Sequence, residues 1–271
     1  MSYREHVKLL LKAFGFIALY FALGLLFGFV FPNVNSVRIT LCVDALLCAV
    51  GFRVCFRNVF PKDVICRQNR GEIERKIYAL RIVEVLSDWL LIQLTVAIFQ
   101  RFVSDGSFAN YQNAMSSASV FEVTFLAVFM APLTEEILMR GWVQSTLRDG
   151  YGPVAAIVIS SVLFAVLHGT LMHLYIGAVM GFVFGILYEE FRFLPLCVFC
   201  HAACNALGIL LSGCVFSSSN AFLFVVIGLN VWMLARILYC LHDMRANYKI
   251  RKLMASNDYE ESLSGDINAK D

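Results

Sequence analysis

Three small groups of polar side chains stand in otherwise apolar stretches of this chain, at spacings that suit catalysis. The groups are Glu135 and Glu136 with Arg140, Phe164 with His168, and His201 with Asn205. A bare charge at bilayer depth costs at least about 2.5–3.5 kcal/mol on insertion scales, so ionisable residues there usually face a bundle interior or a wet cavity. We therefore expect these side chains to have partners or a chemical role.

Helix geometry divides the two adjacent glutamates. Glu136 and Arg140 are four residues apart and can pair on one helix face. Glu135 is rotated by about 100° from its neighbour and is free to face elsewhere. A structural ion pair therefore accounts for one glutamate and leaves Glu135 as the candidate for chemistry.

Position along the chain joins the three groups. A lone histidine on an apolar helix is more often a hydrogen-bonded core residue than a catalytic one, so His168 and His201 are weak candidates singly. Glu135 precedes the Tyr151-Gly152 turn, and His168 follows it, by about sixteen residues or about 24 Å of helix. A hairpin at this turn predicts that Glu135 and His168 lie side by side, and the helix that begins at residue 194 brings His201 and Asn205 to a similar depth.

A carboxylate, two imidazoles and a carboxamide at one depth suit hydrolysis. Glu135 is the candidate general base on a water molecule that His168 helps to hold. His201 and Asn205 are candidate donors to the oxyanion of a tetrahedral intermediate. Alternatively, Glu135, His168 and His201 bind a divalent metal such as Zn²⁺ that carries a water. The residue types suit both mechanisms, and the spacing does not choose between them.

The composition predicts a polytopic membrane protein of the all-α class. Hydrophobic residues make up 59% of the 271 residues and charged residues only 15%, whereas soluble domains are usually about 45–50% apolar. At about 20 residues per span, the chain has room for about eight transmembrane helices. The expected spans begin near residues 9, 37, 78, 120, 154, 171, 194 and 221.

Four regions follow from these spans. Residues 1–119 hold N-terminal transmembrane helices and a basic loop, 120–212 the helices with the three polar groups, 213–245 the last span, and 246–271 a polar tail. Basic residues between 53 and 77, and in the tail, favour a cytoplasmic location for both. This places both termini in the cytoplasm and the protein in the cell membrane.

Other features of the spans predict packing. Gly177, Gly181 and Gly185 let helix backbones approach closely. Arg81, Glu84 and Asp88 share one side of the third span and are expected to pack against the second span and its Asp44.

The cysteines are expected to act mostly as small buried hydrophobes. Cys197, Cys200 and Cys204 beside His201 form a weaker metal-site alternative, because their side chains leave the helix in several directions. His6 and His173 fit no motif.

The polar groups resemble a known family. In order and within hydrophobic helices, they are similar to the three motifs of the CPBP intramembrane proteases: Glu-Glu-x-x-x-Arg (Glu135, Glu136, Arg140), Phe-x-x-x-His (Phe164, His168) and His-x-x-x-Asn (His201, Asn205). The family includes the CAAX prenyl endopeptidases of the Rce1 type and bacterial relatives once called Abi proteins. The resemblance covers roughly residues 120–211; each motif alone is loose, but the three in order form a specific signal.

The resemblance implies a helical membrane endopeptidase with a cavity open to the cytoplasm. Glu135 would be the base, His168 its partner, His201 and Asn205 the oxyanion donors, and Glu136 with Arg140 the supporting pair. The family is commonly labelled metalloprotease, and a metal-free, glutamate-activated water is also argued for it; the metal-free mechanism is favoured here and the metal retained as an alternative.

The implied partners are the lipid bilayer and a membrane-associated peptide, with no nucleic acid. The substrate is a prenylated CAAX protein, a bacteriocin or a signal-peptide-like sequence. Two other functions remain open: a proton- or cation-coupled transporter, because buried ionisable residues commonly mark such pathways, and a non-catalytic scaffold or bacteriocin-immunity protein. The absence of an evident internal repeat disfavours the transporter.

Overall fold

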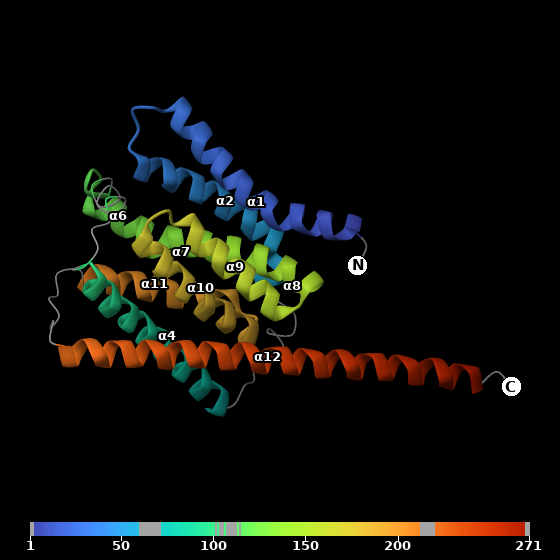
Figure 1. Ribbon diagram of the computed structural model, residues 1–271. Helices are drawn as coiled ribbons and strands as arrows, with labels where there is room; N and C mark the ends of the chain where they lie inside the picture. The colour runs from blue at the N-terminus through green and yellow to red at the C-terminus, as the bar shows by residue number, and fades with distance from the viewer. Residues whose placement is uncertain are drawn as a thin grey trace.

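The computed structural model describes the backbone of residues 3–59, 72–100, 102, 106, 113, 115–211 and 220–268, and the side chains in these ranges outside 52–59, 72–75, 220–221 and 251–268. Every described element is a helix, which confirms the predicted all-α bundle (Figure 1). The sequence predicts about eight spans; five described helices are long and apolar enough to cross a membrane, and Pro153–Leu167 is a shorter apolar helix. The five are Tyr3–Val30, Lys76–Phe99, Leu171–Phe191, Leu194–Leu211 and Phe222–Ile250.

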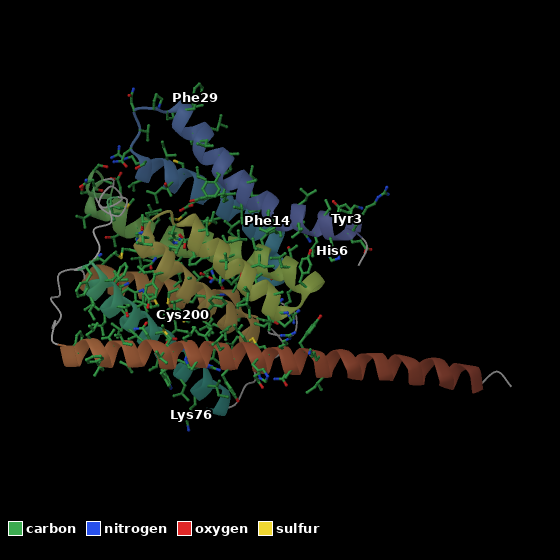
Figure 2. All side chains as sticks on the ribbon, in the orientation of Figure 1. Tyr3, His6, Phe14, Phe29, Lys76 and Cys200 are labelled. Atoms are coloured by element: carbon green, nitrogen blue, oxygen red, sulfur yellow. The ribbon has the colours of Figure 1, made fainter. Side chains whose placement is uncertain are left out.

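Two helices, α1 (Tyr3–Val30) and α2 (Ser36–Val59), form an N-terminal hairpin, and α2 lies between α1 and the centre of the bundle (Figure 1). The side chains of α1 are mostly outside the core, and Phe29 is 86% exposed at the outer edge of the hairpin (Figure 2). Such an apolar, unburied face suits contact with lipid tails.

The third helix, α4 (Glu72–Phe99), corresponds to the predicted third span. The predicted basic loop is partly helical, because α2 continues to residue 59 and α4 begins at residue 72. Residues 60–71 of that loop, and most of the polar stretch 104–119, lie outside the described residues.

A continuous helical rod carries the acidic motif. It consists of α6 (Val120–Phe125), the π-helix η1 (Leu126–Met130), α7 (Ala131–Glu136), the π-helix η2 (Ile137–Gln144) and α8 (Ser145–Tyr151). A capping box begins it: Ser119 accepts from the backbone N–H of Glu122, and the Glu122 carboxylate accepts from the backbone N–H of Ser119. Gly152 ends it at φ 83°, a conformation that glycine adopts without a steric cost.

Helices α9 (Pro153–Leu167) and α10 (Leu171–Phe191) pack closely through the glycine repeat. A Cβ atom added at Gly177 would lie 2.9 Å from Cα of Ala165, and one at Gly181 would lie 2.9 Å from Cα of Ser161. Both distances are shorter than a carbon–carbon contact allows, so the absence of side chains here sets the separation of the two helices.

The last two helices complete the bundle. α11 (Leu194–Leu211) runs through the interior, and Cys200 on it is fully buried near the centre of the bundle (Figure 2). α12 (Asn220–Asn268) passes across α4 and continues well beyond the other helices (Figure 1). Residues 246–268, expected as a polar tail, therefore continue the helix of the last span.

The charged residues of α4 pack differently from the expectation. Arg236 of α12 forms ion pairs with Glu84 and Asp88, and Arg81 pairs with Glu84 at 2.6 Å and with Glu190 of α10 at 2.7 Å. The prediction that this cluster packs against the second span is wrong. The partner for its carboxylates is an arginine on the last helix, about 150 residues further along the chain, and sequence spacing does not reveal this pairing.

We predict that Gly177→Ala lowers the unfolding temperature in detergent, by a destabilisation of about 1–3 kcal/mol, because the new methyl group meets the α9 backbone. The matched control is Gly15→Ala in α1, where nothing lies within 4 Å of an added Cβ. The control should be neutral or slightly stabilising, since alanine favours helix over glycine. Equal effects of the two substitutions would contradict the packing argument.

Candidate active site

A buried arginine organises the site. Arg140 and Glu136 have no exposed surface, and Nη1 of Arg140 donates to Oε1 of Glu136 at 3.1 Å. Its Nη2 donates to the backbone carbonyl of Gly181 at 3.0 Å. The guanidinium carbon lies 4.9 Å from the ring centre of Phe164 and 5.4 Å from that of Phe184. Two aromatic faces, a carboxylate and a carbonyl thus replace the water that a buried cation loses.

Arg140 makes the first of three evenly spaced side-chain contacts between the rod and α10. Gln144 donates to the carbonyl of Gly185 at 2.9 Å, and Arg148 pairs with Glu189 at 2.6 Å. In each of the three contacts the partners are 41 residues apart in sequence. These contacts fix the register of the rod on α10 and so the depth of the acidic motif.

The imidazole of His201 is held by Glu136 as well. Its Nδ1 lies 2.9 Å from Oε1 of Glu136, and its ring stacks on Phe184 with centroids 5.0 Å apart. Because a carboxylate paired with arginine accepts hydrogen bonds, Nδ1 carries the proton. In the neutral ring Nε2 is then an acceptor.

His168 is fixed in the same way by the backbone. It is the C-cap residue of α9, and its Nδ1 lies 2.6 Å from the carbonyl oxygen of Phe164. A carbonyl can only accept, so Nδ1 is again the donor and Nε2 the free acceptor. The neutral forms of both histidines therefore present a lone pair, not a proton, to the site.

Glu135 faces these two nitrogens. Its Oε2 lies 3.9 Å from Nε2 of His168 and 3.7 Å from Nε2 of His201. This oxygen is buried and has no hydrogen-bond partner among the described residues, although the side chain as a whole is 30% exposed. Three acceptor atoms on three separate helical segments thus converge, which requires a shared proton donor or a cation between them.

Asn205 does not join this group directly. Its Nδ2 donates to the carbonyl of Ala127, at 2.7 Å, in the π-helix η1. A π-helical carbonyl normally accepts from the residue five positions later, which is Pro132 and has no N–H. Asn205 therefore supplies the hydrogen bond that Pro132 cannot, and one N–H of its carboxamide remains for another partner.

The chemical types of the candidate ligand atoms suit a metal ion, but the positions of these atoms do not. Each histidine donates Nδ1–H to an oxygen and leaves Nε2 free, as metal-bound histidines usually do. However, the described residues contain no group of three histidine, cysteine or acidic side chains placed as a metal site requires. The three site residues do not fit a bound ion in this arrangement. The alternative at Cys197, Cys200 and Cys204 fails likewise, and these thiols are buried as expected for core residues.

The structure adds residues that the sequence patterns do not associate with the site. Phe184 and the carbonyl of Gly181 surround Arg140. His173, which fits no motif, has its ring 6.1 Å from that of His168. The other unassigned histidine, His6, lies 3.1 Å from the Tyr151 hydroxyl at the end of the rod. The sequence does carry a signal for the Gly181 contact. The glycines of α10 and the polar residues of the rod that pair with α10 both recur every four residues.

Comparison with known proteins agrees with this geometry. Residues 117–207, which hold all three motifs, match the family described as type II CAAX prenyl endopeptidase Rce1-like. This segment is similar to the Rce1-like family. The resemblance predicted from the three motifs is thereby confirmed, and the Rce1-like segment runs from just before the rod to the last turn of α11.

A curated relative extends the likeness beyond the Rce1-like segment. The protein named "Putative membrane peptidase YdiL" from Bacillus subtilis (strain 168) is 25% identical over 175 residues, which is 60% of this chain and 67% of the relative. No solved structure matches the chain. Together with the apolar helices, these likenesses support an integral membrane protein that is similar to membrane peptidases.

We predict that Arg140→Met destabilises the protein by about 3–5 kcal/mol, because it leaves the Glu136 carboxylate buried without its cation. The matched control is Arg148→Met, eight residues later on the same rod, where the guanidinium is 35% exposed. There the loss should be within about 1 kcal/mol. Thermal unfolding in detergent measures both, and a similar loss for the two variants would contradict a central role for Arg140.

Proposed function

We propose that the protein is an intramembrane endopeptidase in which Glu135 activates a water molecule to hydrolyse a peptide bond. The observation that carries the proposal is the convergence of the unpaired Glu135 Oε2 on Nε2 of His168 and His201 within an Rce1-like segment. A water has two protons to give, and three acceptors around it can hold both protons and orient its lone pair toward a carbonyl carbon.

The reaction follows from these roles. The water oxygen attacks the scissile carbonyl carbon while Glu135 takes one of its protons. The protonated Glu135 then gives this proton to the leaving nitrogen as the carbon–nitrogen bond breaks. The products are a carboxylate and an amine, so the hydrolysis consumes one water and needs no other reactant.

The oxyanion requires donors that the neutral histidines lack. Since Nδ1 of each ring is already donating, Nε2 of His168 or His201 donates to the oxyanion only in the imidazolium form. The remaining N–H of Asn205 is the second donor in this proposal. Asn205 then serves both the scaffold at Ala127 and the transition state.

A divalent metal is the alternative for the same three atoms. Glu135 Oε2 and Nε2 of His168 and His201 would be its ligands, and it would supply a water of lowered pKa. Because the described residues place these three side chains in no group that could hold a metal ion, we assign the proton transfer to Glu135 without a metal.

The proposed substrate is a membrane-associated peptide, and the first class to test is a prenylated CAAX sequence because the matched family is named for it. Signal-peptide-like and bacteriocin-type peptides form the other arms of the test. The proposed location is the cell membrane, with both termini in the cytoplasm.

We predict that Glu135→Gln lowers peptide cleavage by at least about 10²-fold, since glutamine has no basic oxygen to accept the proton of water. The purified protein in liposomes is assayed with a farnesylated CAAX peptide and its unprenylated counterpart, and the products are identified by mass spectrometry. Glu122→Gln is the control, because it changes the same residue type on the same rod at a carboxylate that pairs with Arg38. Cleavage by Glu135→Gln at the normal rate would refute the assignment.

We also predict that cleavage survives removal of divalent metals. After dialysis against a chelator, the rate should stay within about twofold, with a zinc endopeptidase assayed in parallel to show that the treatment strips metal. If cleavage is lost and then restored by Zn²⁺, the metal and not Glu135 alone activates the water.

A further inference from the structure

The first turns of α1 carry a stripe of basic side chains. Arg4, Lys8 and Lys12 are four residues apart, so they share one helix face, and all three are exposed. His6 leaves the helix about 200° from Arg4. Its Nδ1 lies 3.1 Å from the Tyr151 hydroxyl, and the two rings stack with centroids 5.5 Å apart. His6 therefore holds α1 against the end of the rod while the α1 stripe stays exposed.

The last helix brings a second basic pair to the same place. Arg245 and Lys249 of α12 are four residues apart and exposed. Between them, Tyr248 packs over Gly152, where an added Cβ atom would lie 3.1 Å from a carbon of the tyrosine ring. Because Tyr151 and Gly152 are adjacent, α1 and α12 contact the same turn at the end of the rod. The α1 stripe and the α12 pair thus lie at one end of the bundle, the end at which Figure 2 labels His6.

The five cations of the stripe and the pair are not neutralised within the part of the chain that the structure describes. No ion pair there involves any of them. Arg148, at the same end, pairs instead with Glu189 at 2.6 Å. The carboxylates in these segments are those of Glu5, Asp149 and Asp243, so the cations are in excess. Positive charge therefore remains here for a partner outside the chain.

The depth of the α1 stripe matches that of lipid headgroups. Residues 13–30 of α1 include no charged residue, and at 1.5 Å per residue they span about 27 Å, close to the hydrocarbon core of about 30 Å. Lys12 therefore lies where the hydrocarbon ends. Trp142 marks the same level: its Nε1 donates to the Lys12 carbonyl at 2.6 Å, and Lys12 Nζ lies 5.5 Å from the ring centre. Tryptophan and tyrosine concentrate at this boundary of a membrane.

We propose that the α1 stripe and the α12 pair bind the phosphate groups of anionic phospholipids in the leaflet at this end of the bundle. The charges are complementary, and basic side chains at headgroup depth lie within the short range over which an anionic membrane surface attracts them. Lipid bound there bridges α1 and α12, two helices outside the Rce1-like segment, at the turn that ends the rod. The site uses neither Glu135 nor the two histidines, so it does not depend on the proposed function.

The test titrates the full chain in detergent micelles with dioleoylphosphatidylglycerol and follows the unfolding temperature, which rises with the concentration of a ligand that binds the folded state. The rise gives an apparent Kd. We expect Lys8→Gln to increase this Kd about fivefold, and the double variant Arg245→Gln/Lys249→Gln to increase it at least about tenfold, because each cation near the phosphates adds to the attraction.

The matched control is Arg38→Gln, which also removes one exposed cation but near the start of α2, at the opposite end of the N-terminal hairpin. It should leave the apparent Kd within about twofold, because charges beyond a Debye length are screened. All the substituted side chains are exposed, so unfolding without added lipid should change little and shows that each variant is folded.

Two further probes separate the lipid from its parts. Dioleoylphosphatidylcholine has the phosphate but no net charge, and soluble glycerol 3-phosphate has the charge but no acyl chains; neither should raise the unfolding temperature. An equal rise with phosphatidylcholine would overturn the charge complementarity, and an equal rise with glycerol 3-phosphate would show that the partner is a soluble phosphate.

The variants decide whether both helices take part. The same apparent Kd for phosphatidylglycerol in the unaltered protein, Lys8→Gln and Arg245→Gln/Lys249→Gln would overturn the site. An increase confined to one of the two helices would overturn the bridge between them. Increases in both, with Arg38→Gln unchanged, are the result expected.

Discussion

The buried guanidinium of Arg140 is the contact on which the rest of the site depends. It donates hydrogen bonds to Glu136 and to the carbonyl of Gly181 in α10. It also lies against the rings of Phe164 and Phe184. Glu136 in turn fixes the imidazole of His201. A charge this deep persists because each partner compensates part of its lost hydration, and removal of one partner leaves the others with an uncompensated charge. The same interaction therefore stabilises the bundle and orients one side of the site.

The chemistry of the site follows from how its hydrogen bonds are already used. Each histidine donates its Nδ1–H to a fixed oxygen, the Phe164 carbonyl for His168 and Glu136 Oε1 for His201. Each presents Nε2 to the same carboxylate oxygen of Glu135. A carboxylate oxygen less than 4 Å from two acceptor nitrogens is unfavourable unless a donor or a positive charge lies between them. A water and a proton satisfy that requirement, which is why the arrangement suits activation of water, and why the oxyanion donors must be charged rings or the free N–H of Asn205.

The rod is irregular where the site requires it. Pro132 at the start of α7 lacks the N–H that the Ala127 carbonyl of η1 would accept, and Asn205 supplies the missing hydrogen bond from α11. The π-helical turns on both sides of α7 change the angular step between residues, so a side chain can be directed where a straight α-helix would not direct it. The contacts from α10, α11 and α2 then replace the rigidity that the regular hydrogen bonds no longer provide.

The residue types and spacings alone determined a helical membrane bundle, the pairing of Glu136 with Arg140, and the hairpin that sets Glu135 beside His168. These features depend on apolarity, on four-residue steps and on equal distances from one turn, all of which are local or countable. The tertiary structure decided what lies across a helix interface. It tied Asn205 to Ala127, set Cys48 against Thr134 and paired Asp88 with Arg236. Such contacts join residues tens to more than a hundred positions apart, and their choice depends on how the helices rotate and cross when they pack, which no periodicity within one helix specifies.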